Sequence, residues 1–519
     1  MVAGGEVRTP DEGCELSHVG GSEPSGSGAS QVGDAASGIR AMSYGGRFDH
    51  ATTLDVMGWP TSVTGAGAPP DGGIAMSRKP IGLPRLRWPA HSGATAGALA
   101  GVIAVVGVLA AADPAGGGTT ALDHGAVVKP AASGSAEVVE DWNRITFRTF
   151  SERAVPVPVQ GLQAAFVGAA VADAVAAIER DYQPYVKQAR APRGASIEAA
   201  TATAAHHVLL ALGPDPTGAL RADYEAWLGR VQNPVARVAG IRVGEAAAAA
   251  LLAAREGDGR NAPITLVTTP GPGVWDPPPT GMLAPWLGFV KPFAVPNQTW
   301  VRLSGPYSLA SMAYAKDFVE VKQMGSRTGS RRSPEETETA LFWSANPVLQ
   351  YNAALRERLA QRDATASEAA RAFGLLGIST ADSLVTCWRA KYDLHNWRPD
   401  AAIRRADTDG NPWTRKQADW EPLVPTPPYP DYTSGHACVT GAFTQTLSHL
   451  YGSRWLDVTV ASSVTGTSRH YETAAELNRE TKNARIWLGL HFRKAMDDGN
   501  RIGRTIADYA ATHVLLPRG

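Results

Sequence analysis

Three short polar clusters in the C-terminal part of the chain carry residue types that bind anions. They read KYDLHNWRP, TSGHA and RIWLGLH, in this order. The first contains Lys391 and Arg398, seven residues apart. On a helix of about 3.6 residues per turn this spacing returns to nearly the same face, so we expect two cations to point in one direction. The third contains Arg485 and His491, and Gly489 between them predicts a bend that brings both side chains to one pocket.

The second cluster predicts a helix start that binds an anion. Ser434, Gly435 and His436 come directly before the apolar run ACVTGAF. Free backbone N–H groups and the positive end of the helix dipole attract negative charge at such a start. Taken together, the three clusters supply two arginines, a lysine, two histidines and a helix N-terminus. This set of donors predicts a pocket for a highly charged tetrahedral or trigonal oxyanion.

The elements that position these clusters are predicted to be helices. We expect an all-α fold of two packed helical bundles, with an N-terminal helical region over 135–330 and a C-terminal bundle over 331–519 that holds the oxyanion site. Within the N-terminal region, the Pro-, Trp- and Gly-rich stretch 261–306 predicts an extended segment laid over a surface. The predicted helices, from their apolar periodicity and start signals, are 160–185, 196–212, 216–231, 234–256, 308–323, 335–343, 347–361, 367–398, 437–450 and 491–513.

The N-terminal part predicts an export signal rather than a folded domain. Residues 1–75 are rich in Gly, Ser, Ala and acidic residues and predict disorder, and we interpret them as an over-extended start before a true initiator at Met76. From Met76 a basic segment precedes an apolar run that ends in small residues at 110–112, the order of a secretory signal peptide, and a Gly/Ala linker continues to 134. The alternative is a membrane anchor over 97–112. No uninterrupted apolar run of 18 or more residues follows, so no second membrane span is predicted.

Composition excludes some classes of partner. The chain has 49 Lys and Arg and 49 Asp and Glu, so its formal net charge is zero and no global basic field for nucleic acid is present. The three cysteines, Cys14, Cys387 and Cys438, lack the spacing of metal or redox motifs. Cys387 and Cys438 lie in apolar helical sequence, which favours buried inert thiols over a disulfide between them.

The three clusters also carry a family resemblance. Lys-x6-Arg-Pro, Ser-Gly-His and Arg-x5-His, in this order, resemble the signature of the superfamily of type 2 phosphatidic acid phosphatases, bacterial acid phosphatases and vanadium-dependent haloperoxidases. From about residue 138 onward the chain is similar in style to the bacterial haloperoxidase branch. The resemblance implies a helical fold of the haloperoxidase and acid phosphatase type.

The resemblance implies a role for each residue of the site. Lys391, Arg398 and Arg485 would neutralise the equatorial oxygens of vanadate or phosphate, and Ser434 and the Gly435 amide would donate further hydrogen bonds. A vanadate ion and a phosphoryl transition state have the same shape and similar charge, so one pocket stabilises either.

The two histidines and two aromatic residues complete the implied site. His491 would be the axial group, bonded to vanadium in a haloperoxidase or attacking phosphorus in a phosphatase. His436 would be the acid–base residue near the apical oxygen. Trp388 and Tyr429 occupy positions that resemble pocket-lining residues of haloperoxidases, although plain core packing is an equal alternative for Trp388.

The chain departs from the family pattern beside the site. Thr433 stands where a proline usually precedes the serine, which keeps every donor. Some relatives carry an acid four residues after the axial histidine, and here that residue is Ala495. Asp498, two helical turns on, is too far away to replace it, so the partner that orients His491 stays open. Asp317 is a candidate to brace one of the arginines.

These observations favour an exported, vanadate-dependent haloperoxidase, an oxidoreductase of the peroxidase class. Its partners would be hydrogen peroxide, a halide and a small organic acceptor, without nucleic acid and without an integral membrane domain beyond the signal. A secreted acid phosphatase that forms a phosphohistidine is the alternative and would need no cofactor. A non-catalytic oxyanion-binding protein is a third interpretation, which the presence of both histidines disfavours.

Overall fold

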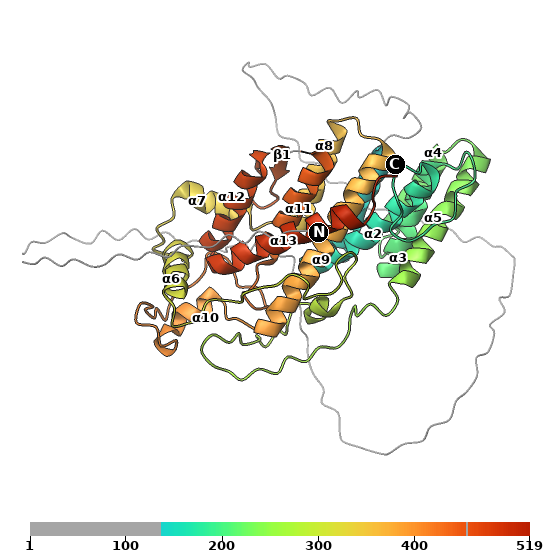
Figure 1. The fold of residues 1–519 in the computed structure, drawn as a ribbon. Coiled ribbons are helices and arrows are strands. Elements are labelled where there is room, and N and C mark those ends of the chain that lie inside the picture. Colours follow the sequence, from blue (N-terminus) through green and yellow to red (C-terminus); the bar gives the residue numbers. More distant parts are fainter. Residues whose placement is uncertain (1–135, 453–454, 519) are drawn as a thin grey trace, which may run out of the picture. The chain divides into compact units, whose positions relative to one another are not determined.

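The computed structural model describes residues 136–452 and 455–518. The predictions for the start, the signal peptide, the linker and Cys14 lie outside the described residues. Figure 1 shows the helices and the hairpin in chain colours. In chain order the elements are α1 Glu137–Glu152, α2 Val157–Ile178, α3 Ile197–Leu212, α4 Ala219–Arg230, α5 Pro234–Ala254, the 3-10 helix η1 Pro285–Phe289, α6 Met312–Met324, α7 Pro334–Phe342, α8 Pro347–Ala360, α9 Ala366–Leu394, α10 Pro399–Arg404, the 3-10 helix η2 Ala406–Thr408, α11 Gly435–Tyr451, β1 Trp455–Ala461, β2 Ser468–Thr473, α12 Ala474–Trp487 and α13 Arg493–His513.

The predicted helical fold class is confirmed, with one addition that the sequence analysis missed. Strands β1 and β2 form an antiparallel hairpin between α11 and α12. Along β1, Leu456, Val458 and Val460 are buried while the residues between them face outward. This alternation of period two is the ordinary signal of a half-buried strand.

Helix α2 forms the inner core of the N-terminal region, where it packs along α9. Small residues let the two backbones approach closely: a Cβ at Gly168 would lie 2.9 Å from the carbonyl oxygen of Phe373, and one at Gly377 would lie 3.0 Å from Cα of Ala165. Among the described helices, α2 alone is long and apolar enough to cross a membrane, but 78% of its most apolar window is buried inside the fold. It is therefore the core helix of this bundle.

The second close approach, between α11 and α13, positions the start of α11. A Cβ at Gly503 would lie 2.0 Å from the carbonyl oxygen of Cys438, and one at Gly499 would lie 2.7 Å from that of Ser434. The backbone N–H of Ser434 donates to the carbonyl of Ala495 in the first turn of α13, at 3.0 Å. Glycines at this contact therefore set the Ser434–Gly435 turn against the segment that carries His491.

Some predicted helix boundaries are confirmed and others are wrong. Asn233 caps α5 with its side-chain oxygen and Pro234 is the first helical residue, as predicted. The start at Pro216 is wrong because α4 begins at Ala219, and the Asp215 carboxylate instead accepts hydrogen bonds from the backbone N–H groups of Leu220 and Arg221.

One buried side chain of α9 binds three consecutive backbone N–H groups of the extended segment 261–306. The carboxylate of Asp382 accepts hydrogen bonds from the backbone N–H groups of Phe293, Ala294 and Val295 at 2.6, 2.7 and 3.0 Å. Asp382 is fully buried. A loop that lacks regular structure thereby acquires partners for its backbone donors, as a covered segment requires.

The predicted continuous helix from 367 to 398 is wrong at its C-terminal end. Helix α9 ends at Leu394, His395 adopts a left-handed conformation with φ 33°, and Arg398 is the N-cap of the separate helix α10. Pro399 explains the break, because a residue before proline is disfavoured in the helical region. Lys391 and Arg398 therefore do not share a helix face. By contrast, the bend at Gly489 is confirmed, since α12 ends at Trp487 and Gly489 has φ +78°.

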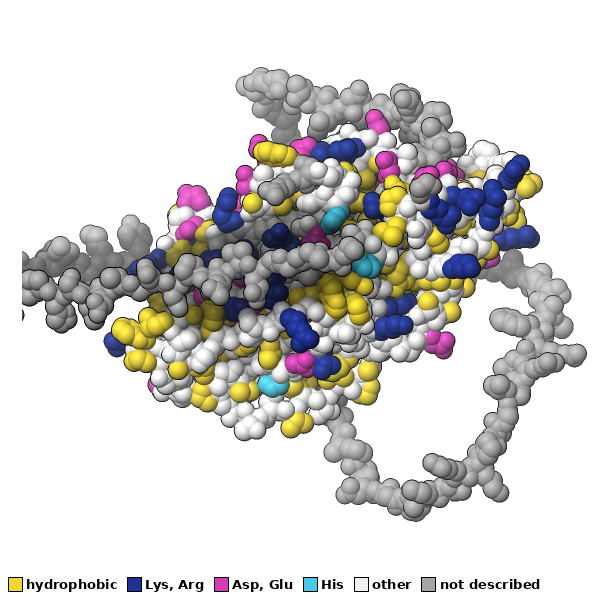
Figure 2. Space-filling model, viewed as in Figure 1, with side chains coloured by type: hydrophobic (Ala, Val, Ile, Leu, Met, Phe, Trp, Pro, Cys, Tyr) yellow, Lys and Arg dark blue, Asp and Glu magenta, His cyan; other side chains and the backbone are white. Residues whose placement is uncertain are grey.

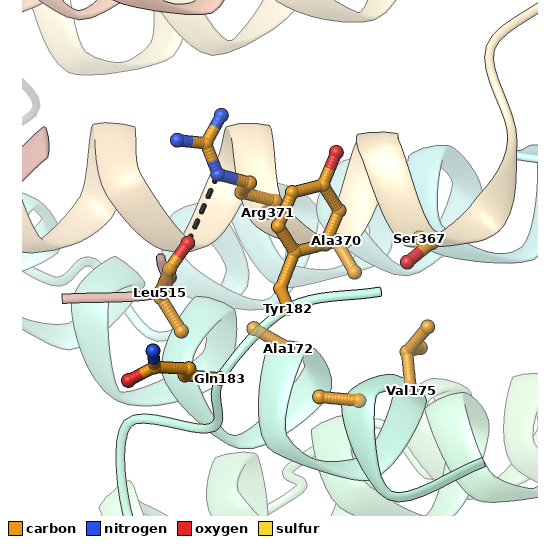
Figure 3. A pocket seen from close by; sticks show the side chains of 9 residues that line it. Ala172, Val175, Tyr182, Gln183, Ser367, Ala370, Arg371 and Leu515 are labelled. Carbon is orange, nitrogen blue, oxygen red and sulfur yellow. Dashed lines mark hydrogen bonds between the residues drawn. The ribbon is translucent and has the colours of Figure 1, made fainter. Parts of the chain in front are cut away.

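Charged side chains of both signs are mixed over the visible face in Figure 2, with a group of Lys and Arg over the end built from α4 and α5. A small hollow of about 210 Å³ lies elsewhere, between α2, the chain after it and the first turns of α9. Figure 3 shows this hollow, where Arg371 Nε donates to the carbonyl oxygen of Leu515 at 3.0 Å. Arg371 lies twenty residues before Lys391 on α9, a separation of roughly 30 Å along the helix. The hollow is thus remote from the three polar clusters.

Candidate active site

Five separate elements bring the predicted site residues together. Lys391 lies in the last turn of α9, Arg398 at the start of α10, Ser434 at the start of α11, Arg485 in the last turn of α12 and His491 in the turn before α13. All five are at most 1% exposed. Charges of this kind are almost never fully buried unless they are paired or hold a ligand.

Backbone carbonyls hold the Lys391 ammonium in place. Its Nζ donates to the carbonyl oxygens of Pro430 at 2.7 Å and Asp431 at 3.1 Å. Burial lowers the pKa of Lys391 to about 8, and the nearby Arg398 cation acts in the same direction. Lys391 is therefore fixed in position while its positive charge is only partly compensated.

The two arginines are oriented by carbonyls and keep unpaired nitrogens. Arg398 donates from Nε to Tyr429 O at 2.9 Å and from Nη1 to Leu490 O at 2.8 Å, whereas Nη2 is buried without a partner. Arg485 donates from Nη1 to Trp343 O at 3.0 Å, and its Nε and Nη2 are buried without partners. Burial lowers the pKa of Arg485 to about 10. Unsatisfied guanidinium nitrogens inside a protein are costly, which points to an anion as their partner.

The Ser434–Gly435–His436 turn forms the helix start that was predicted. The Ser434 side chain caps α11 by accepting from the backbone N–H of Ala437. His436 Nε2 lies 3.3 Å from Ala345 O. Burial lowers the pKa of His436 well below its ordinary value, and the Arg485 cation adds to this effect. In the absence of an anion, His436 is therefore neutral, and a bound anion would raise its proton affinity.

His491 is held by a carboxylate that the sequence analysis did not select. Its Nδ1 lies 2.7 Å from Oδ1 of Asp431, and both side chains are 1% exposed. Its Nε2 lies 3.4 Å from Nη1 of Arg398. Burial lowers the pKa of His491 well below its ordinary value, followed by the Arg398 and Lys391 cations. Burial also raises the pKa of Asp431 to about 7, against the opposing effect of the same two cations.

Two aromatic rings line the cationic side of the site. The Tyr429 ring centroid lies 4.8 Å from Nζ of Lys391 and 4.7 Å from Cζ of Arg398. The Trp388 ring lies 5.1 Å from that of Tyr429, and a Cβ at Gly435 would lie 3.0 Å from Trp388 Cζ3. Both rings attract cations through their faces and exclude water from the donors. Trp388 also packs in the core, so the structure is compatible with both predicted roles.

Two alternatives for neighbouring residues are decided by the structure: the expected buried, free thiols of Cys387 and Cys438 are confirmed, and Asp317 does not take the predicted bracing role. Asp317 accepts from the backbone N–H of Lys494 at 2.8 Å and braces neither arginine of the site. Cys387 and Cys438 are buried and free, so no disulfide joins them, and both lie near the hydroxyl of Thr433.

The arrangement as a whole can bind a multiply charged oxyanion and offer it one imidazole nitrogen. The described residues contain no group of three or more His, Cys, Asp or Glu side chains that would hold a metal cation. The donor set fits a metal that enters as an oxyanion, such as vanadate, because its oxygens meet cations and N–H groups while one nitrogen reaches the central atom.

Comparison with known proteins assigns this arrangement to a family. Residues 371–517 match the model of the VCPO second helical-bundle domain. The C-terminal bundle is therefore similar to the second helical-bundle domain of vanadium chloroperoxidases. The resemblance predicted from the three motifs is thus confirmed.

Individual proteins that resemble this chain are known, and their sequence identity to it is 25% or less. Vanadium chloroperoxidase of Curvularia inaequalis is 25% identical over 226 residues, a match that covers 32% of this chain and 37% of the relative. The chain thus spans little more than a third of the length of this curated relative. A bacterial vanadium-dependent iodoperoxidase has a similar fold, with a TM-score of 0.64, 21% identity, and coverage of 75% of this chain and 99% of its own. A holo-type bacterial vanadium-dependent chloroperoxidase gives a TM-score of 0.58 with 18% identity, and coverage of 69% of this chain and 91% of its own.

Proposed function

We propose that the protein is an exported vanadium-dependent haloperoxidase, which oxidises a halide with hydrogen peroxide and halogenates a small organic acceptor. The observation that carries the proposal is the set of three buried, unpaired guanidinium nitrogens, Arg398 Nη2, Arg485 Nε and Arg485 Nη2. These donors need an anion with several oxygens, and the neighbouring His491 offers a ring nitrogen to its central atom. Export rests on the basic and apolar segment after Met76, which lies outside the described residues.

Each residue has a task that follows from its contacts. Vanadate, when bound, would supply a Lewis-acid centre that activates peroxide. Lys391 and the two arginines would hold the oxygens and balance their charge, and the carbonyls that bind these cations keep them from following the anion out of the site. His436 is neutral at physiological pH in the empty site, so it can accept a proton from incoming peroxide and return it later. Trp388 and Tyr429 would limit the access of water.

The test is an assay of the purified protein with bromide, peroxide and a phenolic acceptor, before and after orthovanadate is added. Halogenation that appears only with vanadate, and that excess phosphate suppresses, supports the proposal. Hydrolysis of a phosphomonoester that vanadate inhibits, without halogenation, would replace it by the acid phosphatase alternative. Absence of both activities, with anion binding intact, would indicate an oxyanion-binding protein.

Substitution of the axial residue sharpens this test. His491→Ala should abolish vanadate retention and halogenation, because the only ring nitrogen next to Arg398 is lost. The matched control is His470→Ala, since His470 lies on β2 with half of its side chain exposed and outside the site. Full activity of His491→Ala would contradict the axial assignment.

A further inference from the structure

The contact between Asp431 and His491 suggests how the His491 ring is oriented, a task that none of the residues in the three motifs performs. Arg398 Nη1 lies 3.4 Å from Nε2 of His491. Because a guanidinium group only donates hydrogen bonds, Nε2 must be the nitrogen that carries the lone pair. The hydrogen of the neutral ring is then on Nδ1, where Oδ1 of Asp431 accepts it at 2.7 Å.

Asp431 is itself fixed from several directions. Its carboxylate also accepts a hydrogen bond from the backbone N–H of Phe492, the residue after His491. Its backbone N–H donates to Asn396 O at 3.0 Å, and its carbonyl oxygen accepts from Lys391 Nζ at 3.1 Å. The backbone of Asp431 is therefore held on both sides, and its carboxylate cannot turn away from His491 without losing the contact to Phe492.

No other carboxylate in the described part of the chain takes this place. Position 495, where some relatives carry an acid, is Ala495, and Asp498 is engaged by Tyr432 and Lys494. Asp317 bonds to the backbone of Lys494. The axial histidine is thus oriented from the segment just before Ser434 rather than from its own helix.

We infer that Asp431 is the positioning residue of the site: it holds His491 as the Nδ1–H tautomer, so that the Nε2 lone pair faces the anion. This inference rests on the proposed function, because it assumes an anion whose central atom bonds to nitrogen. A carboxylate that accepts a hydrogen bond from the second ring nitrogen raises the basicity of a ligating histidine. Its loss typically weakens metal affinity about 10- to 100-fold.

The experiment compares Asp431→Asn with the wild type and uses two anions. An asparagine has the same size, but its amide can donate to Nδ1 and so allow the opposite tautomer. Vanadate requires Nε2, whereas sulfate forms no bond to a ring nitrogen and reports only the cations and N–H donors. We expect Asp431→Asn to lose about 10- to 100-fold in vanadate affinity, and less than threefold in sulfate affinity, by calorimetry.

A ¹⁵N spectrum of histidine-labelled protein measures the tautomer directly, with the His491 signals assigned from a His491→Gln spectrum. The wild type should show the Nδ1–H form, and Asp431→Asn should show the Nε2–H form or a mixture. Asp173→Asn is the control, because Asp173 is a buried carboxylate on α2 that binds the backbone N–H groups of Tyr185 and Val186, away from the site. It should change neither measurement.

Three results would overturn the inference: an unchanged tautomer in Asp431→Asn, unchanged vanadate affinity, or equal losses for vanadate and sulfate. The last would mean that Asp431 only maintains the pocket. Failure of the proposed function shows separately in the wild type. An acid phosphatase would still retain vanadate but would not halogenate, and a protein that only binds oxyanions would bind vanadate no better than sulfate. In either case the ¹⁵N spectra would still decide whether Asp431 sets the tautomer.

Discussion

Replacing Arg485 by methionine should remove anion binding and, in the absence of anion, stabilise the fold. Nε and Nη2 of Arg485 are buried without partners, so both are available to the anion. A hydrogen bond to a charged group contributes about 1.5–3 kcal/mol. Loss of two such bonds should cost about 3–6 kcal/mol, or roughly 10²- to 10⁴-fold in affinity for vanadate or sulfate.

The gain in stability follows from the burial of the same charge. Arg485 is fully buried and its pKa is lowered to about 10 by burial. At about 1.4 kcal/mol per pKa unit, the charged form costs the ligand-free protein roughly 3 kcal/mol. The bond to Trp343 O offsets about half of this cost. Methionine, which adapts to irregular space, should therefore raise the free energy of unfolding by ~1–2 kcal/mol and Tm by about 2 °C.

Arg255→Met is the matched control, because Arg255 is equally buried but fully engaged by Asp258 and by the carbonyls of Lys291 and Pro292. Its loss leaves the buried Asp258 carboxylate with Arg260 alone and the carbonyls of Lys291 and Pro292 without their donor. This should cost about 3–5 kcal/mol, with anion affinity unchanged. The assays are calorimetric titration with each anion and thermal unfolding with and without anion. If Arg485→Met destabilises the ligand-free protein as Arg255→Met does, or keeps its affinity within threefold, the reasoning fails.

Two further predictions concern pH. Because the pKa of Lys391 is about 8, Lys391 loses its positive charge above pH 8, and sulfate affinity should fall about tenfold per pH unit there. Lys391→Met should bind sulfate weakly and show no such dependence on pH. An equal slope in both proteins would exclude Lys391 as its source. His206 stacks on Tyr224, neither of its ring nitrogens has a partner, and burial lowers its pKa to about 4. The unfolded chain therefore takes up the proton first, so stability should be complete above pH 6.5 and fall by up to ~3 kcal/mol as pH drops towards 4. Urea unfolding at pH 7 and 4.5 should show that His206→Phe removes most of the loss that His206 causes. His207→Gln should remove a smaller part, because the His207 charge also lowers the pKa of His206, and equal losses in all three proteins would contradict the assignment.

The structure brings together the residues that the motifs select, but not in the way that the spacing argument expected. Lys391, Arg398, Ser434, Arg485 and His491 are all buried within one constellation of charges, as the three motifs predict. The argument for the first pair was nevertheless wrong, because the two cations lie on different helices. The signal was present in Arg398-Pro399, since a residue before proline rarely continues a helix.

The sequence analysis also missed the β-hairpin, and the reason lies in the hairpin's own sequence. Leu456, Val458 and Val460 alternate with exposed residues in the stretch LDVTV, which is short and lies between long helical segments. A strand of this length shows the alternation of apolar and polar residues only two or three times. The strand is therefore easily overlooked between two long sequences with helical periodicity. Tertiary contacts then determine whether such a stretch forms a strand, and here α8 packs against β1.

Asp431 was missed for a different physical reason, which also explains how the whole site is held. The side chains proposed to bind the anion are recognisable because their types are unusual together, but the atoms that orient them are mostly main-chain carbonyls. Tyr429 O, Pro430 O, Leu490 O and Trp343 O accept from the site cations, and every residue type has such an oxygen.

This use of carbonyls has an electrostatic consequence. A carboxylate beside each cation would neutralise it and compete with the anion, whereas a carbonyl orients the cation and leaves most of its charge available. Among the described residues, the carboxylate in contact with the site, that of Asp431, instead faces His491, where an acceptor would strengthen a ligand rather than cancel a charge. The backbone from Tyr429 to Asp431 therefore explains how Lys391 and Arg398 are oriented while most of their positive charge stays uncompensated.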